Sequence, residues 1–143
     1  MTNLYLTRVA ATGGRNGTIR SEDGLLDLQL AFPRELGGAG GATNPEQLFA
    51  GGYAACFGNA LLRVARQKGC PLSDSDVQVV VEVGLSRTEA DAFLLHVTMT
   101  VIVATLDAST AERLVQDADN ICPYSNAIRG NVEVVRSVKA SRQ

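Results

Sequence analysis

The sequence predicts an α+β fold in which an antiparallel sheet packs against a long central buried helix. The segment Leu48–Leu62 is apolar nearly all round, and a helix without a polar face belongs in a protein interior. Two later segments, Val77–Leu85 and Phe93–Val103, alternate apolar and polar residues. This period of two is typical of strands with one buried face. Together these elements favour a helix packed on a sheet.

The chain has 143 residues and shows no repeat, linker or low-complexity segment, so we expect a single domain over residues 1–143. A net charge of −2 gives no electrostatic reason to expect binding to nucleic acid or to an acidic membrane surface. The first ten residues lack the basic start and apolar run of a signal peptide. The central helix is too short in apolar length, and too rich in glycine, for a membrane span. We therefore expect a cytoplasmic protein, in a compartment where structural disulfides are rare.

Three short strands and a long loop are predicted before the central helix. The strands are expected at Leu4–Ala11, Thr18–Ser21 and Leu26–Leu30. A hairpin turn at Glu22-Asp23-Gly24 separates the last two, with Gly24 supplying the positive φ. The segment Phe32–Thr43 contains a proline and four glycines, which favour a loop.

The central helix is predicted to run from Asn44 to Lys68. Asn44 can accept a hydrogen bond from an early backbone N–H, and Pro45 suits the first helical position. Gln47 is placed to reach back to the cap. Cys56 lies at the middle, so its thiol is expected to be dry unless the helix runs along a cleft or an interface.

The second half of the chain is predicted to form a hairpin, a helix and a last strand. The polar link Ser86–Asp91 joins the two long strands into an antiparallel pair. Ser109 and Glu112 are spaced as a capping box for a helix that stops at Ile121-Cys122-Pro123. The last strand is expected at Asn131–Val138.

The sequence contains three cysteines and one histidine. A single cysteine is most often a small buried side chain, and Cys70, at a helix end, is interpreted as structural or incidental. His96 falls on the polar face of its strand and is expected at the surface. No metal-ligand spacing appears, and we expect neither a metal nor a cofactor.

Two segments, NPEQLFAGGYAACF and ICPYSNAIRGN, together with the turn GGRNG, resemble the organic hydroperoxide resistance proteins. These form a branch of the family that includes osmotically inducible protein C. The resemblance covers essentially the whole chain. It implies a cysteine peroxidase that reduces organic hydroperoxides to alcohols, and an intertwined homodimer whose sheets wrap around two central helices.

The resemblance also implies roles for four residues. Cys56 matches the peroxidatic cysteine and Cys122 the resolving cysteine, so a Cys56–Cys122 disulfide is implied. Arg15 and Glu46 match the charged residues that complete the site. The reductant implied is a protein-bound dihydrolipoyl group or a similar dithiol.

The residue types fit these roles chemically. A peroxide is attacked by a thiolate, and a cysteine in apolar surroundings resists ionisation unless a positive charge is near. Arg15 could supply that charge from its glycine turn, and Glu46 could orient its five donors. A second thiol condenses with the resulting sulfenic acid and prevents further oxidation. An arginine in a turn is more often simply solvated, and an acid in a first helical turn more often serves the helix dipole.

Two other functions compete with a peroxidase. The first is a redox-responsive or lipophile-binding protein that uses the same pocket without turnover. The second, a Cys–His hydrolase, would need His96 close to a cysteine. The presence of both thiols and of Arg15 favours a peroxidase that turns over.

The central helix also predicts a homodimer. One small sheet can cover only one side of it, and Gly51, Gly52, Ala55 and Gly58 suit close contact with a second copy. Glu46 and Cys56 are ten residues apart, about 15 Å along a straight helix. Three arrangements stay open: Arg15 bridges the gap, the helix bends, or one chain completes the site of the other.

Overall fold

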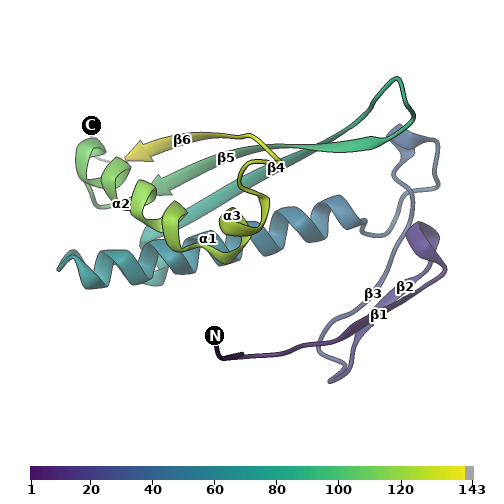
Figure 1. The fold of residues 1–143 in the computed structure, drawn as a ribbon, viewed down its shortest axis with the longest axis horizontal. Coiled ribbons are helices and arrows are strands. Elements are labelled where there is room, and N and C mark those ends of the chain that lie inside the picture. Colours follow the sequence, from purple (N-terminus) through teal and green to yellow (C-terminus); the bar gives the residue numbers. More distant parts are fainter. Residues whose placement is uncertain (141–143) are drawn as a thin grey trace. The chain divides into compact units, whose positions relative to one another are not determined.

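The computed structural model describes residues 1–140. The chain forms two compact units, Met1–Leu48 and the part from Phe49 onward. Each unit contains one three-stranded sheet (Figure 1). Strands and helices in one chain confirm the α+β class.

The first unit is a small antiparallel sheet with the strand order β1-β2-β3. Its strands are β1 (Val9–Thr12), β2 (Thr18–Ser21) and β3 (Asp27–Gln29). The second strand and the positive φ of Gly24, 76°, are confirmed. The predicted start at Leu4 is wrong, because β1 begins at Val9 and the apolar residues before it are exposed. The expected loop contains one short 3₁₀ turn, Arg34–Leu36.

Helix α1 (Pro45–Gln67) matches the predicted central helix. The Asn44 side chain caps it by accepting a hydrogen bond from the Gln47 backbone N–H at 2.9 Å. The predicted return contact from Gln47 to the cap is wrong. Gln47 Oε1 instead accepts a hydrogen bond from the Thr43 hydroxyl at 2.7 Å.

The second unit contains a sheet with the order β4-β5-β6. The strands β4 (Val77–Arg87) and β5 (Phe93–Val103) pair antiparallel, as predicted. The strand β6 (Val134–Ala140) pairs with β5 in parallel, which the prediction of antiparallel pairing did not include. A parallel neighbour needs a long crossover connection, and two helices between β5 and β6 supply it.

These two helices are α2 (Ala108–Ile121) and α3 (Pro123–Ile128). The predicted cap of α2 is wrong. Asp107 caps the helix two residues earlier, accepting hydrogen bonds from the backbone N–H and hydroxyl of Thr110. The predicted stop at Ile121 is confirmed, but a second helix follows at once with Pro123 at its first position.

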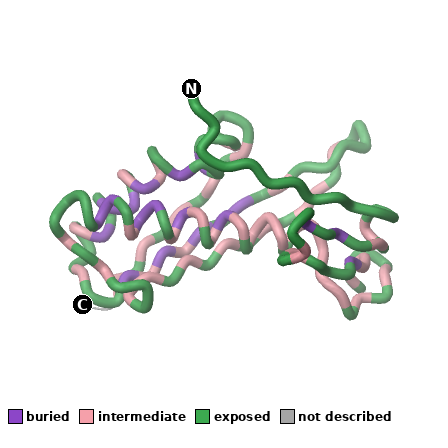
Figure 2. Tube along the Cα trace, turned by 90° about the horizontal axis from the view of Figure 1, so that it is seen from below, coloured by how far each residue is buried: buried purple, intermediate pink, exposed green. Residues whose placement is uncertain are grey.

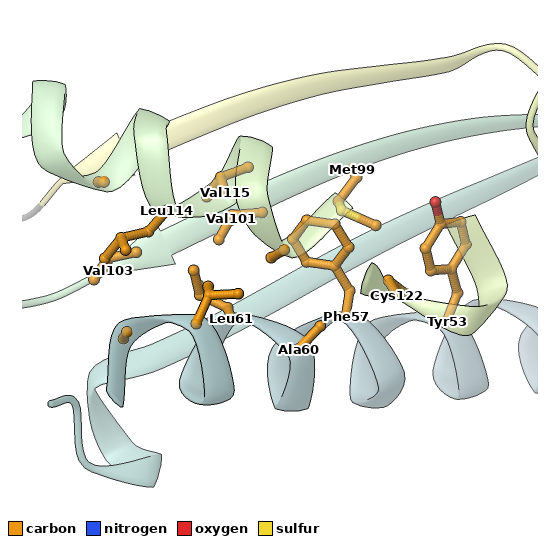
Figure 3. Packing of buried hydrophobic residues seen from close by; sticks show 14 of the residues in the cluster. Tyr53, Phe57, Ala60, Leu61, Met99, Val101, Val103, Leu114, Val115 and Cys122 are labelled. Atoms are coloured by element: carbon orange, nitrogen blue, oxygen red, sulfur yellow. The ribbon is translucent and has the colours of Figure 1, made fainter. Parts of the chain in front are cut away.

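The core of the second unit lies between α1, α2 and one face of β5 (Figures 2 and 3). The inner face of β5 supplies Val97, Met99, Val101 and Val103, all at 2% exposure or less. α1 supplies Tyr53, Phe57, Ala60, Leu61, Val64 and Ala65, and α2 supplies Ala111, Leu114, Val115 and Ala118. Both helices therefore cover the same face of the sheet.

The single chain buries only one side of α1. Gly51, Ala55 and Asn59, spaced four residues apart, are exposed. α1 is long and apolar enough to cross a membrane by length and composition, but a core helix passes the same test, and 33% of its most apolar window is buried. The alternation of buried and exposed residues along α1 indicates a core helix that leaves one small-residue side uncovered.

Candidate active site

Two free thiols meet inside the second unit. Cys56 lies on α1 and is half-buried, while Cys122 is fully buried between α2 and α3. The two thiols lie close enough for Cys122 to raise the pKa of Cys56. Figure 3 shows the Cys122 side chain beside the row of apolar residues on α1. The structure thus brings together two cysteines that are 66 positions apart in the sequence.

The electrostatic surroundings keep the Cys56 thiol protonated. Burial is the largest effect and raises the pKa of Cys56. A hydrogen bond from the Tyr124 backbone N–H lowers this pKa, while Cys122 raises it. Because the net effect is upward, Cys56 needs an additional positive charge to react as a thiolate near neutral pH.

A cleft of about 420 Å³ leads to Cys56 from solvent. It is lined by Cys56, Asn59, Ala60, Arg63, Gln67, Ile121 and Pro123. The sequence left open whether a cysteine in the central helix would be dry or would lie along a cleft. The cleft makes Cys56 the accessible member of the thiol pair, and the fully buried Cys122 the inner one.

Aromatic side chains lie near Cys122 in the second unit (Figure 3). Tyr53 is fully buried, and its hydroxyl is hydrogen-bonded to the Ser125 hydroxyl at 2.7 Å. Burial raises the pKa of Tyr53, so its hydroxyl stays neutral. Tyr124 packs against Phe49 and Tyr53. A Cβ on Gly52 would lie 2.7 Å from the Tyr124 hydroxyl, so this glycine makes room for a side chain of its own chain.

In the first unit, Arg15 and Glu46 form a two-point ion pair. Arg15 Nη1 and Nη2 donate to the two carboxylate oxygens at 2.7 and 2.6 Å. The hydrogen bond from Arg15 lowers the pKa of Glu46, and the bond to Glu46 raises the pKa of Arg15. Both groups therefore stay charged. This fork-to-fork geometry fixes the guanidinium plane, as two parallel bonds do elsewhere.

The local backbone explains how Arg15 is held. It lies in a 3₁₀ turn, Gly14–Asn16, which begins after Gly13 at a φ of 81°. A Cβ on Gly17 would lie 1.7 Å from the Thr12 carbonyl oxygen, so only glycine fits there. Asn16 Oδ1 accepts a hydrogen bond from the Phe32 backbone N–H at 3.1 Å. The guanidinium also lies 5.8 Å from the centre of the Phe32 ring.

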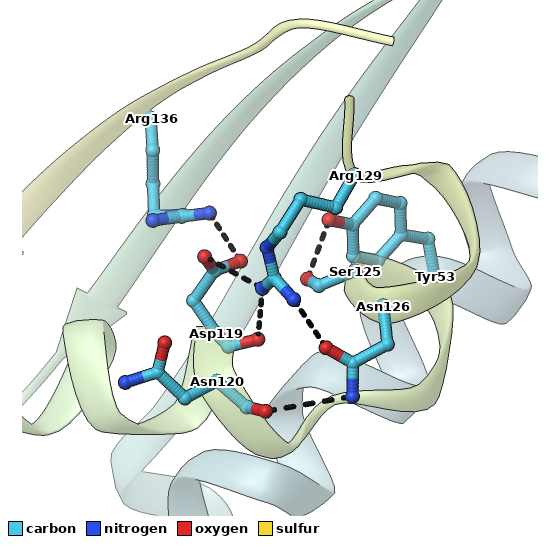
Figure 4. Close-up of polar contacts among 7 residues, drawn as sticks. All are labelled: Tyr53, Asp119, Asn120, Ser125, Asn126, Arg129 and Arg136. Atoms are coloured by element: carbon cyan, nitrogen blue, oxygen red, sulfur yellow. Dashed lines mark hydrogen bonds and ion pairs between the residues drawn. The ribbon is translucent and has the colours of Figure 1, made fainter. Parts of the chain in front are cut away.

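Sequence reasoning missed a polar cluster around the α2–α3 junction (Figure 4). Asp119 pairs with Arg136 at 2.6 Å and with Arg129 at 3.2 Å. Arg129 and Arg136 lie 10 and 17 positions after Asp119 in the sequence, and neither spacing matches the period of a helix or a strand. Only the parallel pairing of β6 brings Arg136 to this place.

The contacts of the remaining two candidates, His96 and Cys70, indicate structural roles. His96 is exposed, as predicted, and its Nε2 is hydrogen-bonded to the Ser86 hydroxyl at 2.6 Å. Cys70 is half-buried and packs against the core of the second unit. Among residues 1–140 no group of three or more histidine, cysteine or acidic side chains could hold a metal ion.

A cleft that leads to one thiol, with a second thiol buried behind it, defines a candidate thiol-redox site on an α+β scaffold. A sequence model of the family described as OsmC-like protein matches residues 38–136. The chain belongs to this family, and its resemblance to the organic hydroperoxide resistance branch is confirmed.

Three relatives illustrate the match. The organic hydroperoxide resistance protein OhrB of Bacillus subtilis is 43% identical over 137 residues, 95% of this chain and 98% of that protein. The organic hydroperoxide resistance protein of Xanthomonas axonopodis pv. citri is 46% identical over 132 residues, 92% of each chain. The crystal structure of an organic hydroperoxide resistance protein from Legionella pneumophila has a TM-score of 0.92 and 52% identity, covering 96% of this chain and 99% of that one.

Proposed function

We propose that this protein is a cysteine-based peroxidase that reduces organic hydroperoxides to alcohols and so acts in organic hydroperoxide resistance. The observation that carries the proposal is the thiol pair, in which Cys56 opens to a cleft and Cys122 lies buried against it. The names of the relatives, organic hydroperoxide resistance proteins, support the same substrate class.

The proposed cycle has three steps. The Cys56 thiolate attacks the terminal oxygen of the hydroperoxide, which carries the hydrogen, and the O–O bond breaks. The alkoxide takes a proton and leaves as alcohol. The resulting sulfenic acid condenses with the Cys122 thiol, which forms the Cys56–Cys122 disulfide and releases water. A dithiol, which we propose to be of the dihydrolipoyl type, then reduces this disulfide and is itself oxidised to a disulfide.

We assign the Arg15–Glu46 pair to the first step. A guanidinium held by a carboxylate can favour the thiolate and bind the oxygens of the peroxide. The apolar and aromatic residues beside the thiols favour an organic tail, because burial of alkyl surface contributes roughly 25 cal/mol per Å². Hydrogen peroxide lacks such a tail. We place the reaction in the cytoplasm, where dithiol reductants keep the cycle running.

Steady-state turnover tests the proposal. The purified protein is expected to consume tert-butyl hydroperoxide continuously in the presence of dihydrolipoamide, with one alcohol formed per dithiol oxidised. Consumption of a single equivalent, without recycling by any dithiol, would instead identify a redox-responsive or lipophile-binding protein.

Replacing Arg15 is expected to weaken peroxide attack with little loss of folding. In Arg15→Ala the thiolate loses its counter-charge, so the pKa of Cys56 should rise further. Each unit of that rise lowers the thiolate fraction about tenfold at a pH below both values. The rate should therefore fall most at low pH and recover as the pH rises. Thiolate absorbance against pH and stopped-flow oxidation measure the two effects.

Arg8→Ala is the matched control for this experiment. Arg8 lies in the same unit and pairs with Glu22, but both side chains are more than two-thirds exposed, at 71% and 72%. The control should leave the Cys56 titration unchanged. An Arg15→Ala protein with wild-type thiolate titration and wild-type rate would remove Arg15 from the proposed site.

We also propose that the two units work as one thiol-peroxidase domain in an intertwined homodimer with shared sites. The uncovered side of α1, with Gly51 and Ala55, suits a second copy. Near the N-terminus, Leu4, Tyr5 and Leu6 are 96%, 79% and 77% exposed. Contact of this segment with a second copy would bury these apolar side chains. We assign the Arg15–Glu46 pair of one chain to the Cys56 of the other.

Mixing inactive variants tests the shared site. Cys56→Ser and Arg15→Ala chains should each be impaired alone. If the site is shared, a heterodimer of the two recovers one intact site. After complete exchange of equal amounts about half of the dimers are heterodimers, so about a quarter of all sites regain activity. Sedimentation velocity supplies the oligomeric state. A fully active monomer, or no recovery after verified chain exchange, would contradict the assignment.

A further inference from the structure

The α2–α3 junction, which holds Cys122, is cross-linked by hydrogen bonds and ion pairs among five residues, here called the Asp119 clamp (Figure 4). The clamp consists of Asp119, Asn120, Asn126, Arg129 and Arg136. We propose that it is a positioning device, which holds Cys122 against Cys56 so that disulfide formation outruns further oxidation of the Cys56 sulfenic acid. This inference rests on the proposed peroxidase cycle.

The clamp ties the two helices on either side of Cys122 to each other. Arg129, just after α3, donates to the Asp119 carbonyl oxygen at 2.8 Å and also to the Asn126 side chain. Asn126 Nδ2 donates to the Asn120 carbonyl oxygen at 3.4 Å. These carbonyls belong to the last turn of α2, where helices leave acceptors unpaired. Residues of and after α3 therefore cap the C-terminal end of α2.

The Cys122 backbone is fixed by the same two helices. Its N–H donates to the Ala118 carbonyl of α2 at 2.9 Å, and its carbonyl accepts from the Asn126 N–H of α3 at 3.0 Å. Asn126 thus bonds to both the cysteine backbone and the end of α2. Any change in the angle between α2 and α3 moves the Cys122 side chain.

A second link anchors the junction to the sheet. Strand alternation turns Arg136 toward the core, where its guanidinium lies 5.4 Å from the centre of the Phe57 ring and its Nη2 donates to Asp119 Oδ1 at 2.6 Å. Both side chains are less than one-fifth exposed, at 18% and 17%. Phe57 directly follows Cys56, so the clamp connects the surroundings of the two thiols.

The energetics of this link favour a positioning role. Arg136 Nε is buried without a hydrogen-bond partner among the described residues, and a buried donor without a partner lowers stability. A buried ion pair is in general a weak source of stability, because desolvation offsets the attraction. What such a pair supplies here is a fixed geometry between α2, β6 and α1.

Positioning matters for the condensation step. The Cys122 sulfur attacks the Cys56 sulfur, the S–O bond breaks, and the hydroxyl leaves as water with the Cys122 proton. The sulfurs must approach to about 2.05 Å, so the α2–α3 junction has to move slightly and along one path. A misplacement of about 1 Å can cost about 100-fold in rate. A slower condensation leaves the sulfenic acid exposed to a second peroxide.

Arg129→Met tests the proposal, since Arg129 is half-exposed, at 48%, and methionine keeps much of its apolar stem. In stopped-flow oxidation with tert-butyl hydroperoxide, the first phase should keep its wild-type rate within about twofold. The second phase, loss of the Cys122 thiol, should slow about tenfold. Mass spectrometry should then find overoxidised Cys56 at a correspondingly lower peroxide concentration.

Lys68→Met is the matched control. It removes the same charge from an exposed ion pair with Asp117 of α2, at 3.7 Å, away from the junction. Both phases should keep their wild-type rates. Arg129→Lys keeps the charge but loses the fork of donors. It should show an intermediate rate, and it serves in place of Arg129→Met if that variant does not fold.

The outcomes distinguish a failure of the Asp119 clamp from a failure of the peroxidase cycle. A variant with a lower melting temperature but a wild-type second phase would overturn the clamp and leave the peroxidase intact. Wild-type protein that forms no Cys56–Cys122 disulfide would instead refute the proposed function itself.

Discussion

Cys56→Ser is expected to reduce hydroperoxide consumption to the uncatalysed background. A serine hydroxyl cannot supply a thiolate-like nucleophile near neutral pH, and the serine oxygen would not form a disulfide with Cys122. Folding should be retained, because the side chain is only half-buried and the replacement is close in size. Turnover of tert-butyl hydroperoxide with dihydrolipoamide, measured beside the wild type, checks this expectation.

Cys70→Ser is the matched control for that variant. Cys70 is also a half-buried free thiol that packs against the core of the second unit. It is expected to keep full turnover. If Cys56→Ser kept its activity and Cys70→Ser lost it, Cys70 would be the peroxidatic cysteine. That result would contradict the assignment of this role to Cys56.

Cys122→Ser is expected to allow one reduction and then to stall. Cys56 can still attack the first peroxide, so a stoichiometric burst of alcohol should appear at close to the wild-type rate. Without the second thiol, the sulfenic acid cannot condense. Further peroxide should then add a second and a third oxygen atom to Cys56, along the sequence sulfenic, sulfinic and sulfonic acid.

Peptide mass spectrometry after graded peroxide exposure locates these oxygens. Wild-type protein under the same exposure should show the Cys56–Cys122 disulfide instead. Oxygen found on another residue, or sustained turnover by Cys122→Ser with a dithiol, would show that Cys122 does not resolve the oxidised cysteine.

Local signals predicted the long elements well. The cap at Asn44, Pro45 at the first position and the apolar run defined α1 almost to the residue. Strict alternation of apolar and polar residues likewise predicted β4 and β5. These features depend on neighbours in the sequence, where propensity and pattern carry the information.

Features that depend on distant contacts could not be predicted. Nothing local distinguishes Asp107 from Ser109 as a helix cap, and the choice follows from where the chain leaves β5. The parallel pairing of β6 is a property of the whole crossover. The Asp119–Arg136 contact depends in turn on that pairing.

The candidate site likewise combines features that the sequence indicated with features that depend on distant contacts. Cys56, Cys122, Arg15 and Glu46 were found by resemblance to known motifs, because single charges and thiols have common structural explanations. The two-point contact of Arg15 with Glu46 and the meeting of the thiols are geometric facts that only a folded chain reveals. Their roles in catalysis stay predictions.

The parallel pairing of β5 with β6 also bears on the order of folding. Its first paired residues, Val97 and Val134, are 37 positions apart, and such non-local pairings form slowly because a long loop has to close first. Cys122 lies inside that loop. We therefore expect the two thiols to stay apart in partly folded chains and to meet only when the last strand docks, so that redox competence is acquired at the final stage of folding.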